Sequence, residues 1–233
     1  MCKEISGEFK SRIGYEFNDG ALLAQALTHS SYSNERKLPI KSCNERLEYL
    51  GDAVLELSVS DHVFSAYPDL SEGEMTKLRA SVVCEPTLAG AARRVGLGAA
   101  LRMGRGEDNT GGRERDSILS DAFEAVIGAI YKDGGFGAAR DFVKRQLTPD
   151  IETMLYRFNV ADPKTFLQER IQARSKSPLV YTVIGESGPD HDKTFRVAVS
   201  HCGSEIGRGE GRSKKEAEQA AANDALKKEG VGD

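Results

Sequence analysis

Apolar residues recur at helical spacing along roughly the first 155 residues of the chain. The pattern predicts a series of helices, interrupted at Gly14, Pro39, Pro68 and Gly96, and contains no strand signals. The predicted helices are residues 4–13, 18–28, 43–66, 72–83, 85–95, 118–131 and 136–155, the last with a break at Pro149. This part of the chain therefore predicts an all-α domain.

The pattern changes near residues 159–162, where a new helix is predicted to begin. Asp162 is a typical N-cap residue, and Pro163 suits the first helical position because its missing N–H would be unpaired there anyway. The helical spacing then continues to about Ala173. A short linker over residues 156–161, which is not rich in Gly or Ser, separates this helix from the preceding one.

Alternating apolar and polar residues follow, and they predict strands at residues 179–186, 194–199 and 204–209. Ser213 and Glu216 form a capping box (S-x-x-E) that opens a last helix to about residue 228. On that helix, small residues form one face that can pack closely on a sheet: Ala217, Ala220, Ala221, Ala222 and Ala225. The order α-β-β-β-α predicts a compact α+β module.

The length of 233 residues and a hydrophobic content of 39% are enough for one large domain or two modest ones, and the change of pattern favours two. We therefore predict an all-α domain over residues 1–155 and a small α+β domain over residues 162–231. No apolar run approaches the roughly 20 residues of a membrane span, and the N-terminus lacks the apolar core of a signal peptide. Cys2, Cys43, Cys84 and Cys202 show no CxxC spacing, which argues against a zinc site or a disulfide framework. These features predict a cytoplasmic protein without a membrane partner.

The net charge of −4 argues mildly against a nucleic-acid partner when the chain is taken as a whole. Any contact with phosphates must therefore depend on local patches. Lys214 and Lys215 supply one such patch, because they lie in the first turn of the last predicted helix, where free N–H groups and the helix dipole favour anions. The simpler alternative is that both are ordinary solvated lysines.

Acidic residues form a pattern on two predicted helices. Glu45, Glu48 and Asp52 are spaced i, i+3 and i+7, which places them on one helix face. The apolar residues predicted on the opposite face are Leu47, Leu50, Val54 and Leu57. A solvated face on which Glu45 and Glu48 pair with Arg46 or other basic side chains would explain this pattern equally well.

Asp121 and Glu124 are harder to explain in that way, because their helix is apolar almost all the way round and Gly128 continues their stripe. Buried acids are costly unless they are paired, protonated or bound to a metal. Two acidic clusters far apart in sequence are most simply explained by a divalent cation such as Mg²⁺, which prefers carboxylate oxygens and shares its shell with phosphate. Such a site supports hydrolysis of a phosphodiester.

No other residue set competes convincingly for catalysis. The histidines lie in separate segments, at positions 29, 62, 191 and 201, and a lone histidine is more often structural or exposed. Residues 104–112 form a polar, glycine-rich segment without the GxxxxGK[ST] order of a phosphate-binding loop, so a mobile loop is predicted there.

The run Asn-Glu-Arg-Leu-Glu-Tyr-Leu-Gly-Asp at residues 44–52, together with residues 117–128, closely resembles the ribonuclease III family. Residues 162–228 resemble the double-stranded RNA-binding domain of that family, most recognisably over residues 211–222. The resemblance covers nearly the whole chain in the bacterial order, an endonuclease domain followed by an RNA-binding domain.

The resemblance implies a role for each acid. Glu48, Asp52, Asp121 and Glu124 match metal-binding acids of the family, and Asp52 with Glu124 matches its catalytic pair. The accessory acids would be Glu45 and Glu72, with Glu74 as the alternative to Glu72, and Tyr49 matches an aromatic dimer contact. All six acids are present, which argues against an inactive copy. Cys43 replaces a histidine that many relatives carry, outside the carboxylates.

In the second domain, the resemblance implies that Gln168, Glu169, His191, Lys214 and Lys215 contact RNA. The family recognises A-form duplex by shape, through 2′-hydroxyls and phosphates. From its own position, His191 would be interpreted only as an exposed turn residue.

The function that the resemblance implies is a homodimeric endoribonuclease that hydrolyses double-stranded RNA with Mg²⁺, for which Mn²⁺ can substitute. It would leave 5′-phosphates and short 3′ overhangs, and it would process ribosomal RNA precursors and structured messenger RNAs. Two alternatives from other classes are a duplex-RNA-binding regulator that does not cut, and a helical structural or ribosome-associated protein with incidental acids.

Overall fold

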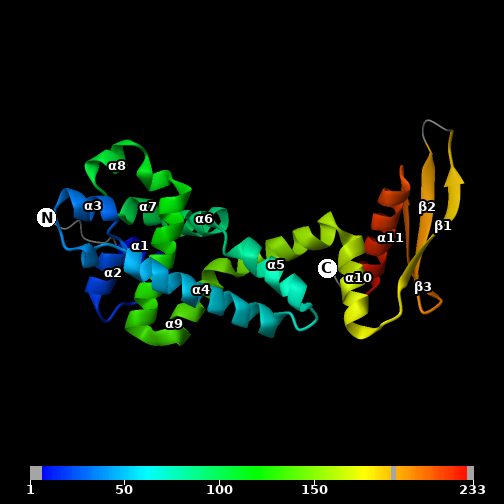
Figure 1. The fold of residues 1–233 in the computed structure, drawn as a ribbon, viewed down its shortest axis with the longest axis horizontal. Helices are drawn as coiled ribbons and strands as arrows, with labels where there is room; N and C mark the ends of the chain where they lie inside the picture. The colour runs from blue at the N-terminus through cyan, green and yellow to red at the C-terminus, as the bar shows by residue number, and fades with distance from the viewer. Residues whose placement is uncertain (1–6, 190–192, 230–233) are drawn as a thin grey trace. The chain divides into compact units, whose positions relative to one another are not determined.

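The computed structural model describes residues 7–189 and 193–229 of the chain. The chain forms two compact units (Figure 1). The helical unit comprises the chain up to Pro68 together with Met75–Ile151, and the mixed unit comprises Asp69–Glu74 and the chain from Glu152 onward. Within the described residues, no helix is both long and apolar enough to cross a membrane.

Helices make up the chain as far as the second unit, in agreement with the predicted all-α domain. They are α1 (Gly7–Ile13), α2 (Gly20–Ala26), α3 (Ser30–Glu35), α4 (Glu45–Ala66), α5 (Glu72–Val82), α6 (Glu85–Val95), α7 (Leu97–Ala100), α8 (Arg105–Asn109) and α9 (Asp116–Ala161), with 3₁₀ turns at Ile40–Ser42 and Gly112–Glu114. The short helices α3, α7 and α8 were not predicted, because each spans too few turns to show a helical period.

Helices α4 and α9 cross in close contact through two glycines (Figure 1). A Cβ atom on Gly51 of α4 would lie 1.8 Å from the carbonyl oxygen of Glu124, and one on Gly128 of α9 would lie 2.1 Å from that of Leu47. Only glycine permits such an approach of two backbones. The crossing therefore brings the acidic stripes of the two helices together.

Large apolar side chains of α9 fill the centre of the helical unit. Phe123 and Phe142 are fully buried, with ring centroids 5.6 Å apart, and Ile127 and Ile130 are inaccessible to solvent. On α4, Leu47 and Val54 are buried, whereas Leu57, predicted on the same face, is 57% exposed. The apolar face of α4 is therefore only partly buried.

Helix α9 differs from the prediction at two of its three expected interruptions. Pro149 lies inside the helix, and the residues predicted as a linker, 156–161, are helical. A proline removes one intrahelical hydrogen bond, but the buried side chains of Leu147 and Ile151 on either side hold the flanking turns in place. The third interruption is confirmed, because the break at Gly135, where φ is 77° and ψ is −177°, lies between the predicted helices 118–131 and 136–155.

The segment predicted as a mobile loop, residues 104–112, contains α8 and leads into a 3₁₀ turn. Arg113 holds it in place, because its guanidinium donates hydrogen bonds to Asp108 and to the carbonyl oxygens of Gly98 and Leu101, at 2.7–2.8 Å. This segment is stabilised by polar contacts rather than by an apolar face, so hydrophobic periodicity could not reveal it.

The mixed unit has the predicted α-β-β-β-α order. Its elements are α10 (Pro163–Arg174), β1 (Leu179–Ser187), β2 (Thr194–His201), β3 (Ser204–Gly211) and α11 (Lys214–Lys228). The strands form one antiparallel sheet in the order β1-β2-β3. The predicted N-caps are confirmed: the Asp162 side chain accepts the N–H of Thr165, and Ser213 Oγ accepts the N–H of Glu216.

The small-residue face of α11 packs against the sheet as expected. A Cβ atom on Gly209 would lie 2.1 Å from the backbone nitrogen of Ala221, and one on Gly207 would lie 2.4 Å from its carbonyl oxygen. The buried core beneath includes Leu167 of α10 and Val199 of β2. Glycine on the strand and alanine on the helix thus let the two backbones approach closely.

Candidate active site and nucleic-acid interface

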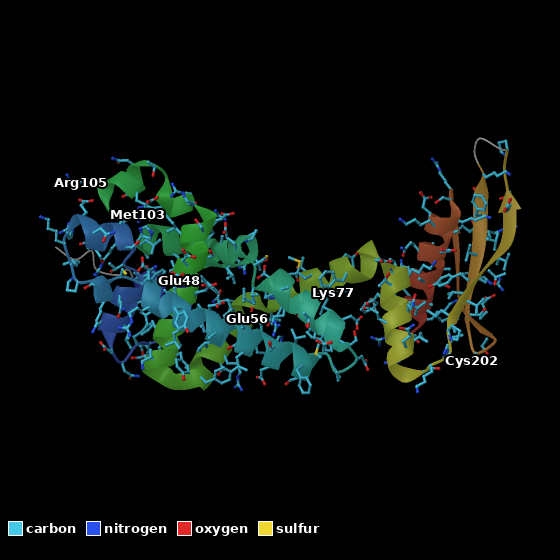
Figure 2. All side chains as sticks on the ribbon, in the orientation of Figure 1. Glu48, Glu56, Lys77, Met103, Arg105 and Cys202 are labelled. Atoms are coloured by element: carbon cyan, nitrogen blue, oxygen red, sulfur yellow. The ribbon has the colours of Figure 1, made fainter. Side chains whose placement is uncertain are left out.

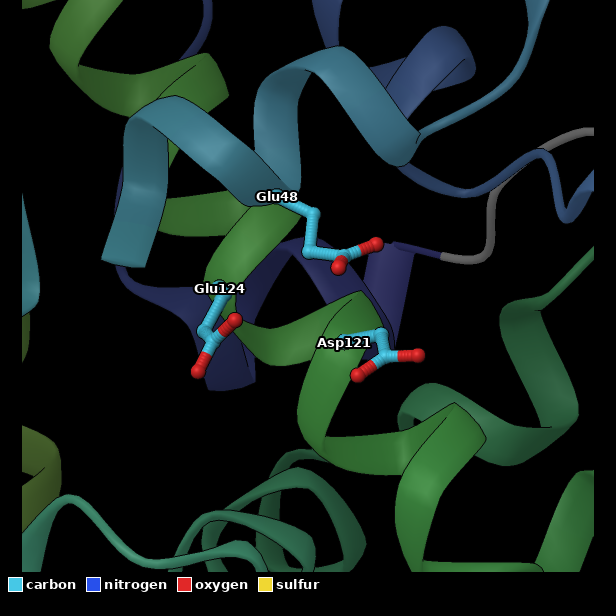
Figure 3. A group of neighbouring side chains, drawn as sticks. All are labelled: Glu48, Asp121 and Glu124. Atoms are coloured by element: carbon cyan, nitrogen blue, oxygen red, sulfur yellow. The ribbon is translucent and has the colours of Figure 1, made fainter. Parts of the chain in front are cut away.

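Three carboxylates from the two crossing helices converge in the helical unit (Figure 3). Glu48 comes from the first turn of α4, and Asp121 and Glu124 come from α9. One carboxylate oxygen from each lies within 4.8 Å of the others, and all three side chains are half-buried. The predicted convergence of the two acidic patterns therefore occurs.

The environment of these acids opposes their ionisation. Burial raises the pKa of Glu124 to about 8, and the charges of Asp52, Asp121 and Glu48 add to the effect. Burial also raises the pKa of Glu48 to about 6, with contributions from Asp121, Glu45 and Asp52. Like charges this close disfavour a second ionised carboxylate. The metal-free cluster is therefore electrostatically unfavourable at neutral pH.

The donor set fits a hard divalent cation. Within the described residues, no Lys or Arg forms an ion pair with Glu48, Asp121 or Glu124, so no such cation neutralises the charge of the cluster. Carboxylate oxygens are the ligands that Mg²⁺ prefers, and it binds through a few of them while keeping waters and phosphate oxygens in its shell. A bound cation would relieve the repulsion that raises the pKa values.

Asp52 and Glu45 lie near this cluster on α4 but are not among the three converging acids. Both side chains are exposed. Burial is the main cause of the raised pKa values of Glu124 and Glu48. The charge of Asp52 raises the pKa of Glu124 further, and the charge of Glu45 raises the pKa of Glu48 further. The thiol of Cys43 is buried and forms a hydrogen bond with the Glu45 side chain. Two further acids thus contribute to the negative potential of the site from its rim.

The structure distinguishes Glu72 from Glu74. The carboxylate of Glu74 is buried and accepts the N–H of Ser71 at 2.7 Å, while Ser71 Oγ accepts the N–H of Glu74 at 3.3 Å. This reciprocal pair caps the start of α5. Glu72 is exposed in the first turn of the same helix. The Glu74 carboxylate is thus engaged in capping α5, whereas the Glu72 side chain is accessible to solvent.

The predicted RNA contacts lie in the mixed unit. Lys214 and Lys215 are exposed in the first turn of α11, and Lys214 Nζ lies 5.8 Å from the centre of the Phe195 ring. Gln168 is exposed and Glu169 half-buried on α10. The predicted contact His191 lies outside the described residues.

Sequence analysis missed two residues close to the acid cluster. Burial and the charge of Glu85 raise the pKa of Asp121, whereas His29 and a hydrogen bond from Ser120 lower it. His29 and Glu85 are distant from Asp121 in the sequence, and no local pattern marks either residue. Their effect on the pKa of Asp121 depends on how distant segments of the chain pack together.

The comparisons with known proteins agree with the site and the fold. A family model described as Ribonuclease-III-like matches residues 19–151, and one described as Double-stranded RNA binding motif matches residues 163–229. The chain is 53% identical over 230 residues to Ribonuclease 3 of Desulforamulus reducens, covering 98% of this chain and 94% of that protein. It is 49% identical over 223 residues to Ribonuclease 3 of Pelotomaculum thermopropionicum, covering 96% of this chain and 92% of that protein.

Among solved structures, the nuclease domain of ribonuclease III from Campylobacter jejuni is 41% identical, with a TM-score of 0.58. The matched region covers 64% of this chain and 96% of the Campylobacter jejuni domain. The fold and the acidic site thus define an endoribonuclease that acts on double-stranded RNA. The chain belongs to the ribonuclease III family.

Proposed function

We propose that this enzyme is a Mg²⁺-dependent homodimer that cleaves duplex RNA to leave 5′-phosphates and short 3′ overhangs, with Mn²⁺ as a substitute metal. The single observation that carries the proposal is the convergence of Glu48, Asp121 and Glu124, which form no ion pair with Lys or Arg among the described residues. Its substrates in the cell would be ribosomal RNA precursors and structured messenger RNAs. The cytoplasmic location remains a prediction from the sequence.

In this proposal Glu48, Asp52, Asp121 and Glu124 hold the metal, with Glu45 and Glu72 as accessory acids. When bound, Mg²⁺ would supply stabilisation of the charge on the scissile phosphate and a more acidic water. The pKa of Glu124 is about 8 without metal, so at pH 7 its carboxylate would have to release a proton to bind the cation. Asp52 is exposed beside Glu124, where it can contact the substrate.

The proposal is tested by incubating the full chain with a long RNA duplex and with a single strand of the same length, in Mg²⁺ or in EDTA. We expect fragments only from the duplex and only with Mg²⁺, ending in 5′-phosphates. Duplex that is bound but uncut would favour the non-cutting regulator, and failure to bind duplex would favour the structural protein.

The proposed dimer contact is an apolar stripe along α4. Tyr49, Leu57 and Phe64 are 83%, 57% and 72% exposed, and their spacing places them within about a quarter-turn of one another. Exposed apolar side chains that gather on one face often mark an interface. Two strands of a duplex require two sites related by a two-fold axis. A Campylobacter jejuni ribonuclease III structure, 42% identical with a TM-score of 0.56, is described as flexible in a region involved in dimer formation.

Replacing Phe64 with Glu should weaken dimerisation by at least about 100-fold, because the carboxylate would be desolvated against an apolar surface. Sedimentation equilibrium measures the effect directly. The matched control is Tyr156→Glu, which places the same charge at an aromatic that is 67% exposed on α9. A dimer of unchanged stability in Phe64→Glu would exclude this stripe as the interface.

The proposed RNA contacts are Gln168, Glu169, His191, Lys214 and Lys215. Lys214 and Lys215 extend from the N-terminal turn of α11, where the unpaired N–H groups and the helix dipole also favour a phosphate. Gln168 and Glu169 offer groups that can bond 2′-hydroxyls.

Replacing Lys214 and Lys215 together with Ala should weaken duplex binding and lower the slope of log affinity against log salt by about two, one for each lost phosphate contact. Binding is measured with Ca²⁺ or EDTA at several salt concentrations. The matched control is Lys227→Ala with Lys228→Ala, which removes the same charge from the last turn of α11. Equal salt slopes in the two double variants would remove Lys214 and Lys215 from the interface.

A further inference from the structure

The side chain of Gln219 joins the two helices of the mixed unit. Its Oε1 accepts the backbone N–H of Lys164 at 2.9 Å, and its Nε2 donates to Asp162 Oδ1 at 3.0 Å. Asp162 and Lys164 belong to the start of α10, whereas Gln219 lies half-buried in the second turn of α11, 57 and 55 residues further along the chain. One amide group thus uses its acceptor and a donor to hold the start of α10 against α11.

The first turn of α10 depends on this partner. Pro163 occupies the first helical position and has no N–H, so the unpaired N–H groups of the turn begin at Lys164. Asp162 accepts the N–H of Thr165 at 3.2 Å and the Thr165 hydroxyl at 2.6 Å. Gln219 accepts the N–H of Lys164. The N-terminus of α10 is therefore capped both by its own Asp162 and by a side chain of α11.

An ion pair lies beside these hydrogen bonds. The ammonium group of Lys164 pairs with the carboxylate of Glu218, the neighbour of Gln219 on α11, and lies 4.6 Å from the centre of the Tyr181 ring on β1. The side chains of Lys164 and Glu218 are 37% and 28% exposed, so the pair contributes little by itself. The directed bonds of Gln219, one of them to a carboxylate, are therefore the stronger restraint on the two helix ends.

Gln219 lies between the two groups of proposed RNA contacts. On α11 it follows Lys215 by four residues, so the two side chains lie on one helix face a turn apart. Hydrogen bonds from Thr165 and Gln219, and then the charge of Lys215, hold the pKa of Asp162 below its ordinary value. On α10, Gln168 follows Thr165 by three residues, again on one face. The restraint at Gln219 therefore acts on both groups.

The separation of these two groups matters because of the shape of the ligand. A double-stranded RNA-binding domain contacts successive minor grooves and the phosphates across the major groove between them. The A-form fixes that spacing, and B-form duplexes differ from it in the width of both grooves. Two contact groups held at a constant separation therefore distinguish duplex RNA from duplex DNA.

We propose that Gln219 is a positioning residue for RNA recognition, which holds the start of α10 on α11 so that Gln168 and Lys215 meet the minor groove and the phosphates of one A-form duplex together. This inference rests on the RNA contacts proposed above and adds the residue that sets their separation. The alternative is a structural role alone, in which Gln219 stabilises the mixed unit without affecting which duplex it selects.

Two substitutions on α11 separate these roles. Gln219→Met removes both hydrogen bonds with little change in side-chain length or helix propensity. The matched control is Asp224→Ala, because half-buried Asp224 accepts the N–H of Arg208 on β3 at 2.9 Å. Asp224 lies further along α11, toward the turn between β2 and β3 that carries Cys202 (Figure 2). The control thus removes a bond between α11 and another element away from α10, and its lost charge acts alike on both duplexes.

The experiment measures binding of the full chain to a duplex RNA and to a duplex DNA of the same sequence, in EDTA, together with thermal unfolding. For Gln219→Met we expect RNA affinity lower by about 5- to 30-fold, the factor that corresponds to two lost hydrogen bonds. DNA affinity should stay within about twofold, because it depends on phosphate charge. Asp224→Ala should lower Tm by a similar amount to Gln219→Met but keep the wild-type ratio of RNA to DNA affinity.

A double-variant cycle connects Gln219 with Gln168. Gln168→Ala removes a proposed contact on α10, so in that background Gln219→Met has one contact fewer to displace. The loss of RNA affinity in the double variant should therefore be smaller than the product of the two separate losses. Independent losses that multiply would contradict the positioning role.

A wild-type ratio of RNA to DNA affinity in Gln219→Met, with or without a lower Tm, would overturn the inference. If Gln168→Ala and the double Ala variant of Lys214 and Lys215 both bind duplex RNA like the wild type, the proposed contacts fail and this inference with them. If Gln219→Met does not fold, Gln219→Glu decides, because it keeps the acceptor for the Lys164 N–H but places a like charge beside Asp162. An unchanged ratio in Gln219→Glu would then exclude the positioning role.

Discussion

Replacing Glu124 with Gln should lower the rate of duplex cleavage by more than about 100-fold, since even residues that only support metal ligands contribute 10- to 100-fold. The substitution removes one of the three converging carboxylates and leaves the size of the side chain unchanged. Duplex affinity in EDTA should stay within about twofold, because binding depends on phosphate contacts elsewhere. Single-turnover cleavage and a binding titration measure the two quantities.

The matched control for cleavage is Glu152→Gln, which makes the same change at an exposed position of α9. It should cut at the wild-type rate. Cleavage by Glu124→Gln at the rate of this control would remove Glu124 from the active site, and the metal-ion proposal would then lose its most buried ligand.

The substitution Glu124→Gln should also stabilise the metal-free protein at high pH. The pKa of Glu124 is about 8 in the folded chain against an ordinary 4.5, so between these values the folded state binds more protons than the unfolded state. Stability therefore falls as pH rises through this range. A Gln side chain does not ionise, so the variant avoids this loss of stability. After allowance for solvent screening we expect a gain of at least about 1 kcal/mol at pH 8, or roughly 2–4 °C in Tm.

Thermal unfolding in EDTA at pH 5 and pH 8 shows whether the effect of Glu124→Gln on Tm has the expected sign. The difference in Tm between Glu124→Gln and the wild type should be larger at pH 8 than at pH 5. A variant that is less stable than the wild type by the same amount at both pH values would show that the acid cluster imposes no electrostatic cost.

Replacing Gly51 with Ala should destabilise the helical unit by more than about 4 kcal/mol, the range that marks a severe steric or core defect. The new Cβ would lie 1.8 Å from the carbonyl oxygen of Glu124. Because this oxygen belongs to the backbone of α9, no side-chain rotation relieves the clash, and the two helices must separate. Separation would also move Glu48 away from Asp121 and Glu124, so cleavage should be lost as well.

The matched control is Gly137→Ala, on the exposed side of α9, where a Cβ atom would meet nothing within 4 Å. It should be neutral or stabilising by about 0.4–1 kcal/mol, through the lower entropy of the unfolded chain. Denaturant titrations compare the two variants. Stability of Gly51→Ala within 1 kcal/mol of the control would contradict the close crossing of α4 and α9.

The local signals in the sequence predicted much of this architecture. The caps at Asp162 and Ser213 bond to N–H groups three residues away, and the apolar spacing of residues 85–95 matches α6. Such features depend on neighbours within one or two turns, so a single sequence contains them. The wrong predictions, a break at Pro149 and a mobile loop at 104–112, concern segments that distant contacts stabilise.

Two acidic patterns on two predicted helices, followed by an α-β-β-β-α module, can be inferred from the sequence alone. The meeting of Glu48 with Asp121 and Glu124 is visible only in the folded chain, because it depends on the close approach of two backbones at Gly51 and Gly128. The exposure of Leu57 on α4 is likewise visible only in the folded chain. Helical periodicity records which residues share a face, but burial and pKa depend on what packs against that face, and those atoms come from elsewhere in the chain.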